Sequence, residues 1–409
     1  MSALADAVLP LIRSRADLHR WNVANAHGAQ MHGAVDVLER AATTDPAEAF
    51  AVTQRAIASA IKVIMRADDS SGIIGDACRR LLDLHAATAG PAMAAPAKLV
   101  TWLIAFQFDQ ECDFFPIDPV RYAPALGEVG MAAYRRRLAE RRATLGPEPD
   151  RGESWRSPNA RDWFTIHDND QRLAVLDRDI EAIITTHARD QRVPAWLQDT
   201  AVAFAEIGEY DLAIEWAQRA VAHPTGGHQA ITAARYLAEL VAAHRPEALV
   251  DATRATFDRW PTAGHAAALR SAVGTAWPQL REHVLTHLRR APREAVTFAL
   301  TTLGEPALAW TLAHELDLTD GDLWSRLLTA YEKVDALATL PMHTRLVIDQ
   351  LGVANAQNYR YAARRLARMR RLASDTPQAA EVDQLIADLR QEHRRRPRLQ
   401  QEFTAAGLP

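Results

Sequence analysis

The sequence predicts an all-α protein, and three observations support this prediction. Apolar residues recur with helical periodicity along almost all 409 residues, and no six-residue stretch alternates cleanly enough to indicate a strand. The chain contains 79 alanines and 44 arginines, both of which lose little conformational freedom in a helix. With 48% hydrophobic and 24% charged residues, the composition is that of a globular protein. We therefore expect a helical N-terminal domain, a helical repeat array and a basic helical cap.

The N-terminal domain is expected over residues 1–145. Helices are predicted over residues 3–20 and 22–41, and a further helix begins at Asp45-Pro46. A polar loop at residues 68–72 precedes the next helix, and the last helix of the domain is expected over about 127–144. Residues 146–162 are rich in proline, glycine and charge, which is typical of a linker. The repeat array then occupies residues 163–354, and the basic cap occupies residues 355–409.

Several classes of protein are excluded by what the sequence lacks. Cys78 and Cys112 are too few for a thiolate zinc site, and two isolated cysteines fit a reducing cytoplasm. The N-terminus does not resemble a signal peptide, and the best apolar run, Leu99 to Phe106, is too short to span a membrane. Phosphate-binding, dinucleotide-binding and nucleophile-elbow motifs are absent. We therefore expect a cytoplasmic protein and assign no catalytic residue, cofactor or metal.

One segment of the array is similar to the tetratricopeptide repeat. Its sequence, AFAEIGEYDLAIEWAQRAVAHP, places a turn at Gly208 between two apolar helical stretches. Glycine lets such a turn close, and the small side chains of Ala213 and Ala220 let two antiparallel helices approach. Ala248 follows Ala213 by 35 residues, close to the period of about 34 for this repeat. The similarity implies a tetratricopeptide-like α-solenoid.

The chain as a whole resembles an uncharacterised family of bacterial helical proteins. The resemblance rests on four segments: DDSSGIIGD from Asp68, the aromatic and acidic run at 106–115, GEYDLAIEW from Gly208, and LRQEHRRRPRL from Leu389. In that family such arrays sometimes follow a zinc-binding SWIM module. This chain lacks the Cys-x-Cys and Cys-x-His pairs of the module, so the resemblance implies a helical fold and no zinc-dependent function.

A polar stripe on the second predicted helix is the first candidate site. Asn22, Asn25 and His32 fall on one helical face at 100° per residue. This face is a candidate for hydrogen bonding to a ligand or partner. The alternative is a polar seam between helices.

Acidic residues in two loops form the second candidate site. Carboxylates on two loops are able to chelate Mg²⁺ or Ca²⁺, which prefer oxygen ligands. In the alternative interpretation, Asp68 or Ser70 caps the helix that begins near Gly72, and the helix dipole favours Asp76. The group comprises Asp68, Asp69, Asp76, Asp109 and Asp113.

His283 and His287 have the spacing that places two imidazoles on one helix face. In a zincin helix a glutamate directly follows the first histidine, whereas here Glu282 precedes it. The sequence offers no obvious third ligand nearby. We therefore assign no metal site to this pair.

Arginine is concentrated near the C-terminus. Residues 355–409 carry 11 arginines and six acidic residues, whereas residues 151–354 carry 20 basic and 27 acidic residues. A basic tail is able to bind nucleic-acid phosphates with strong salt dependence. The alternatives are a solvated face and docking onto the acidic middle of the chain. The tail group consists of Arg394, Arg395, Arg396 and Arg398.

The leading functional hypothesis is a protein-interaction scaffold or adaptor, because helical repeats expose a concave surface suited to partners. We expect it to bind a peptide or partner helix through Tyr210, Trp216 and Arg219. One alternative is a nucleic-acid-associated protein that binds through the basic tail. Another is an enzyme or metal-binding protein built on the acidic loops. The other tryptophans of the array, including Trp196, are expected in the core.

Overall fold

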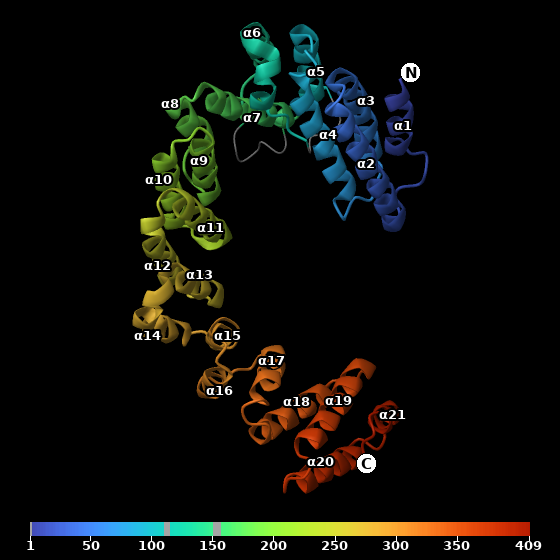
Figure 1. Cartoon of the computed structure of the whole chain (residues 1–409), viewed down its shortest axis with the longest axis vertical. Coiled ribbons are helices and arrows are strands. Elements are labelled where there is room, and N and C mark those ends of the chain that lie inside the picture. The colour runs from blue at the N-terminus through green and yellow to red at the C-terminus, as the bar shows by residue number, and fades with distance from the viewer. Residues whose placement is uncertain (1, 110–114, 150–156) are drawn as a thin grey trace. The chain divides into compact units, whose positions relative to one another are not determined.

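The computed structural model describes residues 2–109, 115–149 and 157–409. Every regular element in these residues is a helix, which confirms the predicted all-α class (Figure 1). The chain divides into two compact units, residues 1–233 and 234–409. None of the described helices combines the length and apolar content needed to cross a membrane.

The first unit contains α1 (Ala3–Ile12), α2 (Trp21–Ala42), α3 (Pro46–Ile64), α4 (Ile73–Ala89), α5 (Pro96–Phe108), α6 (Pro119–Thr144), α7 (Ala160–Asp177), α8 (Ile180–Ile183), the π-helix η2 (Ile184–Ala188), α9 (Pro194–Glu206) and α10 (Tyr210–Ala222). The division between the units falls inside α11 (Gly227–His244).

Helices α1 to α4 form an N-terminal bundle, drawn in blue in Figure 1. Helix α3 begins as predicted, because the Asp45 carboxylate accepts a hydrogen bond from the Glu48 amide at 2.9 Å. Helix α1 ends at Ile12, so the helix predicted over residues 3–20 was too long. The ring of His27, in α2, donates to the Ile12 carbonyl at 3.0 Å and so satisfies the end of α1. Leu18 then packs into the core from an irregular segment.

Three buried polar side chains join α5, α6 and α7. The Tyr134 hydroxyl donates to the Asn169 carbonyl oxygen and accepts from the Gln107 amide at 2.8 Å. The Asn169 amide closes the triangle by donating to the Gln107 carbonyl oxygen at 2.8 Å. Burial raises the pKa of Tyr134, so its hydroxyl stays protonated as a donor.

The predicted linker at 146–162 covers the connection between α6 and α7 and the first three residues of α7, and these two helices pack against each other. Its residues 150–156 lie outside the described residues. The placement of a domain boundary in this linker, with domains over 1–145, 163–354 and 355–409, stays a prediction.

Helices α9 and α10 pack against each other and are joined by the short turn at Gly208 that the sequence predicts. Gly208 has φ +81°, a conformation that side chains with a Cβ rarely adopt. Ala213 and Ala220 are fully buried, which lets the two helices pack closely. Ala248 instead precedes α12 and is half-buried, so it does not repeat the packing of Ala213. The tetratricopeptide-like solenoid therefore stays a proposal.

The second unit contains the 3₁₀-helix η3 (Pro246–Ala248), α12 (Leu249–Arg259), α13 (Ala263–Val273), the 3₁₀-helix η4 (Gly274–Ala276), α14 (Trp277–Leu288), α15 (Pro292–Thr297), the π-helix η5 (Phe298–Leu303), α16 (Pro306–Glu315), α17 (Gly321–Tyr331), the 3₁₀-helix η6 (Leu337–Thr339), α18 (Leu340–Gly352), α19 (Ala356–Leu372), α20 (Ala379–Glu392) and α21 (Pro397–Ala405). One apolar core of this unit surrounds Trp324, and another surrounds Leu366 and Phe403.

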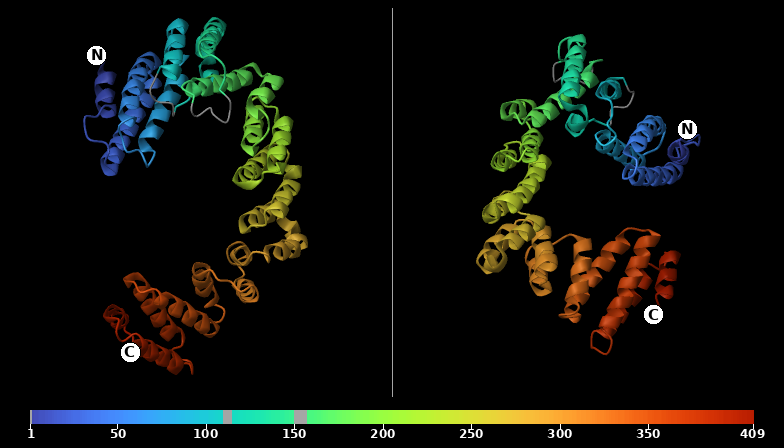
Figure 2. Two further views of the ribbon diagram at one scale, coloured as in Figure 1. Left: turned by 180° about the vertical axis from the view of Figure 1, so that it is seen from behind. Right: turned by 45° about the horizontal axis from the view of Figure 1, so that its top comes forward.

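The arginine-rich helix α19 packs against α18, α20 and α21 at the red end of the chain (Figure 2). Two of its arginines contact a largely buried acid and a buried imidazole. Arg368 donates to Glu332 at 2.9 Å, and Arg365 donates to Nδ1 of His343 at 3.0 Å. His343 donates from Nε2 to Glu332 at 2.9 Å. These arginines therefore hold α19 against the end of α17 and against α18.

His85 is fully buried in the first unit and is neutral there. Its ring lies between Phe50 and Trp102, with centroids 4.3 and 4.1 Å away. Nδ1 of His85 lies 3.0 Å from the Tyr122 hydroxyl. Burial lowers the pKa of His85 from 6.5 to about 3.

We expect acid to destabilise the protein partly through His85. Between pH 6.5 and about 3, the unfolded chain binds a proton at this residue that the folded chain does not bind. Stability should therefore fall with decreasing pH by up to about 1.4 kcal/mol per pH unit. His85→Phe should remove this contribution and flatten the pH dependence of the free energy of unfolding, measured by urea denaturation. The same replacement at exposed His19 is the control, and parallel pH profiles for the wild type and His85→Phe would contradict the expectation.

Candidate functional site

A pocket of the first unit lies among α7, η2 and the start of α9, and we name it the α7–α9 pocket. Its volume is about 670 Å³. Aromatic, basic and acidic side chains from these elements and from residues 148–149 surround it. The lining residues are Glu148, Pro149, Ala160, Trp163, Phe164, His167, Asp170, Thr185, Thr186, Arg189, Asp190, Arg192, Val193 and Trp196.

One wall of the pocket is an irregular backbone segment. The π-helix η2 is followed by Arg189 with φ 51° and Gln191 with φ 57°. Residues with side chains rarely adopt positive φ, and such conformations persist where surrounding contacts impose them. The Gln171 amide, from α7, contributes one such contact by donating to the Thr186 carbonyl at 3.1 Å. The shape of this wall is therefore set by neighbouring helices.

Helix α10 and the residue that follows it hold the same segment from the other side. Arg219 donates to the side-chain oxygen of Gln191 at 2.6 Å. His223 donates from Nε2 to the Gln191 backbone carbonyl at 2.9 Å. The side-chain oxygen and the backbone carbonyl of Gln191 are thus both hydrogen-bonded. These two contacts hold the segment that carries Arg189 on the pocket wall.

The acids that line the pocket all have partners close by. Asp170 pairs with Arg142 at 2.5 Å, Asp190 with Arg192 at 3.1 Å, and Glu148 lies 3.2 Å from Nε2 of His167. The side chains that partner these acids lie in α6, in α7 and in the segment before α9.

Arg189 is in a different situation, because no carboxylate among the described residues forms an ion pair with it. Asp168 and Asp199 interact with it electrostatically, but neither reaches ion-pair distance. Its guanidinium lies 5.1 Å from the ring centroid of Trp196. The pocket therefore combines aromatic walls with one cation that forms no ion pair in the described parts of the chain. The aromatic wall includes Trp196, which the sequence analysis expected in the core.

The predicted partner-binding residues all lie on α10. Trp216 is only 4% exposed and belongs to the packed interior. Arg219 covers it, with its guanidinium 3.7 Å from the ring centroid. Tyr210, at the start of the helix, is 39% exposed. At 100° per residue, Tyr210 and Arg219 lie on opposite sides of α10, so the three residues do not form one face.

The predicted polar face on α2 lies against the start of α4. His32 donates to the Ile73 carbonyl at 3.1 Å and accepts from Arg80 at 2.9 Å. Asn25 accepts a hydrogen bond from the Ser71 hydroxyl, whereas Asn22 is exposed. Asn25 and His32 therefore take part in a polar seam between helices.

The predicted acidic site divides into local interactions. Asp69 accepts from the amides of Ile74 and Gly75 at 2.9 and 2.8 Å, so it caps α4. Capping was expected from Asp68 or Ser70, but the one hydrogen bond that the Asp68 carboxylate accepts among the described residues comes from the Ser70 amide at 3.2 Å, outside α4.

The remaining acids pair with arginines or lie beyond the description. Asp76 forms an ion pair with Arg79 at 2.5 Å, and Asp109 lies 3.8 Å from Arg141. Asp113 lies outside the described residues. The acids that are described do not gather around one point.

The four arginines of the basic tail are engaged unequally. Arg396 donates to the Leu351 carbonyl at 2.8 Å, and Arg398 pairs with Glu402 at 2.7 Å. Arg394 and Arg395 are exposed and have no ion pair within the described parts of the chain. Nucleic-acid binding through this tail stays a prediction.

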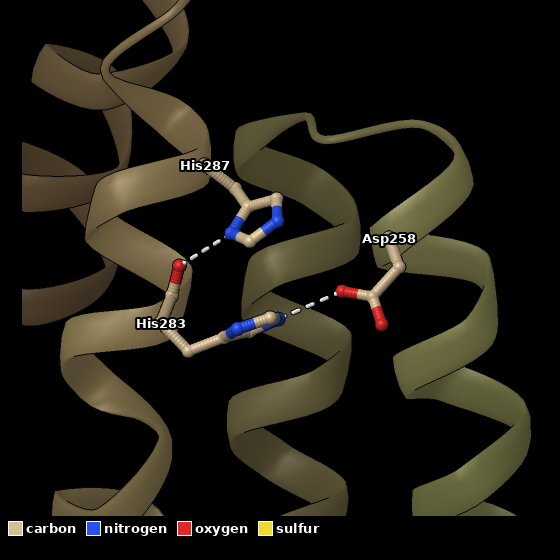
Figure 3. Close-up of side chains that lie close together, drawn as sticks. All are labelled: Asp258, His283 and His287. Carbon is tan, nitrogen blue, oxygen red and sulfur yellow. Dashed lines mark hydrogen bonds and ion pairs between the residues drawn. The ribbon is translucent and has the colours of Figure 1, made fainter.

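A group of metal-ligand type, which the sequence analysis did not identify, occurs in the second unit. Asp258 of α12 joins His283 and His287 of α14, and one ligand atom from each lies within 4.8 Å of the others (Figure 3). The spacing of the histidines was visible in the sequence. Asp258 precedes His283 by 25 residues, and only helix packing brings it close.

Comparisons with known proteins place this chain among uncharacterised proteins, as the resemblance had suggested. The profile of a family of unknown function, DUF6880, matches residues 11–399. A search of curated proteins found no match. The matched range includes the α7–α9 pocket and the group formed by Asp258, His283 and His287.

The two interpretations of the acidic loop predict different behaviour for Asp69. As a helix cap it accepts two amide hydrogen bonds, so Asp69→Ala should lower the free energy of unfolding by about 1–2 kcal/mol. Asp68→Ala, the matched control, should cost less than about half as much because it removes one local contact. Urea denaturation with and without Mg²⁺ or Ca²⁺ measures both effects. A cation-dependent rise in wild-type stability that either variant abolishes would favour the metal interpretation instead.

Proposed function

This chain belongs to the DUF6880 family, and we propose that it is a protein-binding adaptor that holds a partner peptide in the α7–α9 pocket. The observation that carries the proposal is the combination of three aromatic side chains with Arg189, which has no ion pair among the described residues, around about 670 Å³ of space. Tryptophan and arginine are enriched among the residues that dominate protein–protein binding energy.

The aromatic lining supports recognition of an apolar side chain. Trp163, Phe164 and Trp196 line one continuous pocket, and Phe164 is 55% exposed. Exposed aromatic surface of this kind is costly in water and favourable when a partner covers it. A pocket of this volume lies within the usual range of about 300–1,000 Å³ for ligand sites. It therefore has room for one or two side chains of a peptide.

Arg189 adds a preference for negative charge. Since the acids in the pocket lining already have partners, an incoming carboxylate meets a cation that no described residue holds in an ion pair. Arginine suits this role because its planar guanidinium can bind a carboxylate through two hydrogen bonds while stacking on an aromatic ring. We infer a partner segment in which an apolar side chain lies next to an aspartate or glutamate.

The backbone of the pocket wall is held in place by hydrogen bonds from neighbouring helices, and this favours a binding role for the pocket. Contacts from Gln171, Arg219 and His223 hold the segment that carries Arg189. A wall that is ordered before binding lowers the entropy lost on association. Arg219, proposed from the sequence as a contact residue, contributes here by positioning the wall.

A peptide selection tests the proposal. Random peptides displayed on phage are selected against the full-length protein, and the enriched sequences are measured by fluorescence polarisation. We expect enrichment of acidic residues beside aromatic or aliphatic ones. Arg189→Ala should weaken binding at least about tenfold, equivalent to 1.4 kcal/mol.

Arg192→Ala provides the matched control, because Arg192 lines the same pocket but pairs with Asp190. It should change the affinity by less than about threefold, as is usual for exposed ion-paired residues. The adaptor proposal fails if no peptide is enriched, or if the enriched peptides bind the Arg189→Ala variant as tightly as the wild type.

A further inference from the structure

We propose that Asp258, His283 and His287 form a binding site for a first-row divalent transition-metal ion, with Zn²⁺ as its test ion. Imidazole nitrogens and a carboxylate oxygen are ligands that this class of ion prefers. All three residues lie in the second unit, so the site is independent of the α7–α9 pocket.

The distances between the ligand atoms fit a small ion after modest side-chain rotation. Nε2 of His283 lies 2.8 Å from a carboxylate oxygen of Asp258, and the ligand atoms of all three residues lie within 4.8 Å of one another. Tetrahedral Zn²⁺ with bonds of about 2.0–2.1 Å separates its ligand atoms by roughly 3.3 Å. The three donors therefore already surround a volume close to the size that an ion requires.

The hydrogen bonding of His287 points to a ligand rather than to a structural histidine. Its Nδ1 donates to the backbone carbonyl of His283 at 2.8 Å, which fixes the proton on Nδ1 (Figure 3). Nε2 then carries the lone pair, and no described residue donates a hydrogen bond to it. A histidine ligand whose other nitrogen donates to a carbonyl is the usual arrangement around bound zinc.

Neighbouring side chains orient the other two ligands. Arg254 lies 3.8 Å from the second carboxylate oxygen of Asp258, one turn away on the same helix. The buried ring of Phe257 meets both imidazoles edge-on, at centroid distances of 6.3 and 6.0 Å. Asp258 is exposed and the two histidines are half-buried, so the outer side of the site is open. An ion held by these three residues would keep a coordination position for water or for a donor atom of a partner.

Calorimetric titration with Zn²⁺ tests the site on full-length protein without a histidine tag, after stripping with a chelator. We expect saturation at one equivalent. Co²⁺, titrated in parallel, should give visible absorption of the strength typical of low-symmetry tetrahedral or five-coordinate ligation. Weak uptake that does not saturate, or Co²⁺ absorption that stays that of the hydrated ion, would overturn the proposal.

Two variants separate metal binding from packing. Asp258→Asn keeps an oxygen that accepts from His283, so the melting temperature of the metal-free protein should not change, yet loss of the anionic ligand should weaken Zn²⁺ binding at least about tenfold. His287→Gln should weaken it at least about 100-fold.

His244→Gln removes an exposed histidine of the same unit and should leave Zn²⁺ affinity unchanged. If both site variants bind one equivalent as tightly as the wild type, the ion is held elsewhere and the assignment is wrong. If His287→Gln does not fold, Asp258→Asn still decides the question, because it retains the contact between α12 and α14.

Discussion

The hydrogen-bonded triangle of Gln107, Tyr134 and Asn169 is the constraint on which the first unit depends. Buried polar groups are costly unless every one is paired, and here each side chain satisfies the other two. Forming all three hydrogen bonds at once restricts the relative placement of α5, α6 and α7. Apolar contacts alone would allow these helices to slide, so the triangle adds positional specificity to packing energy.

Helix α7 contributes a large part of the wall of the α7–α9 pocket. The helix contributes Trp163, Phe164 and His167 to the lining. It is tied onward by Arg172, whose guanidinium binds Asp118 at 2.9 and 3.0 Å and Glu206 at 2.6 and 2.7 Å. Two carboxylates held by one guanidinium connect the start of α6 to the end of α9.

The features that the sequence predicted best are local ones. Apolar periodicity, the cap at Asp45 and the glycine turn at Gly208 depend on residues within a few positions of each other, and all three appear where expected. The sequence analysis did not predict that α1 ends at Ile12. The carbonyl of Ile12 accepts a hydrogen bond from His27 in the next helix, and such a contact leaves no signal in the residues around Ile12. The sequence analysis assigned the cap of α4 to Asp68 or Ser70, whereas Asp69 is the cap. All three residues lie in the same loop, and the backbone conformation of the loop decides which side chain reaches the free amides of the helix.

For the candidate sites, too, the sequence predicted contacts between residues that are close along the chain and missed contacts between residues that are far apart. Two ligands of the proposed metal site share one helix and have a recognisable spacing, whereas Asp258 is contributed by tertiary packing. The positive φ of Arg189 and Gln191 has no sequence signal, because neither residue type prefers that conformation. The sequence shows the concentration of arginines near the C-terminus, but it does not show which residues these arginines contact. Glu332 and His343 lie outside that segment.

Glu332 couples the substitutions that Arg365, Arg368 and His343 can tolerate during evolution. It accepts from Arg368 and His343, and Arg365 reaches the same imidazole from its other side. Losing the acid would leave cationic and polar groups without their partner in a poorly solvated space, and lysine cannot reproduce the planar guanidinium contacts. These positions are therefore expected to change as a group between related chains. Exposed arginines such as Arg394 are under no such restriction, so similar residues in one arginine-rich segment should diverge at very different rates.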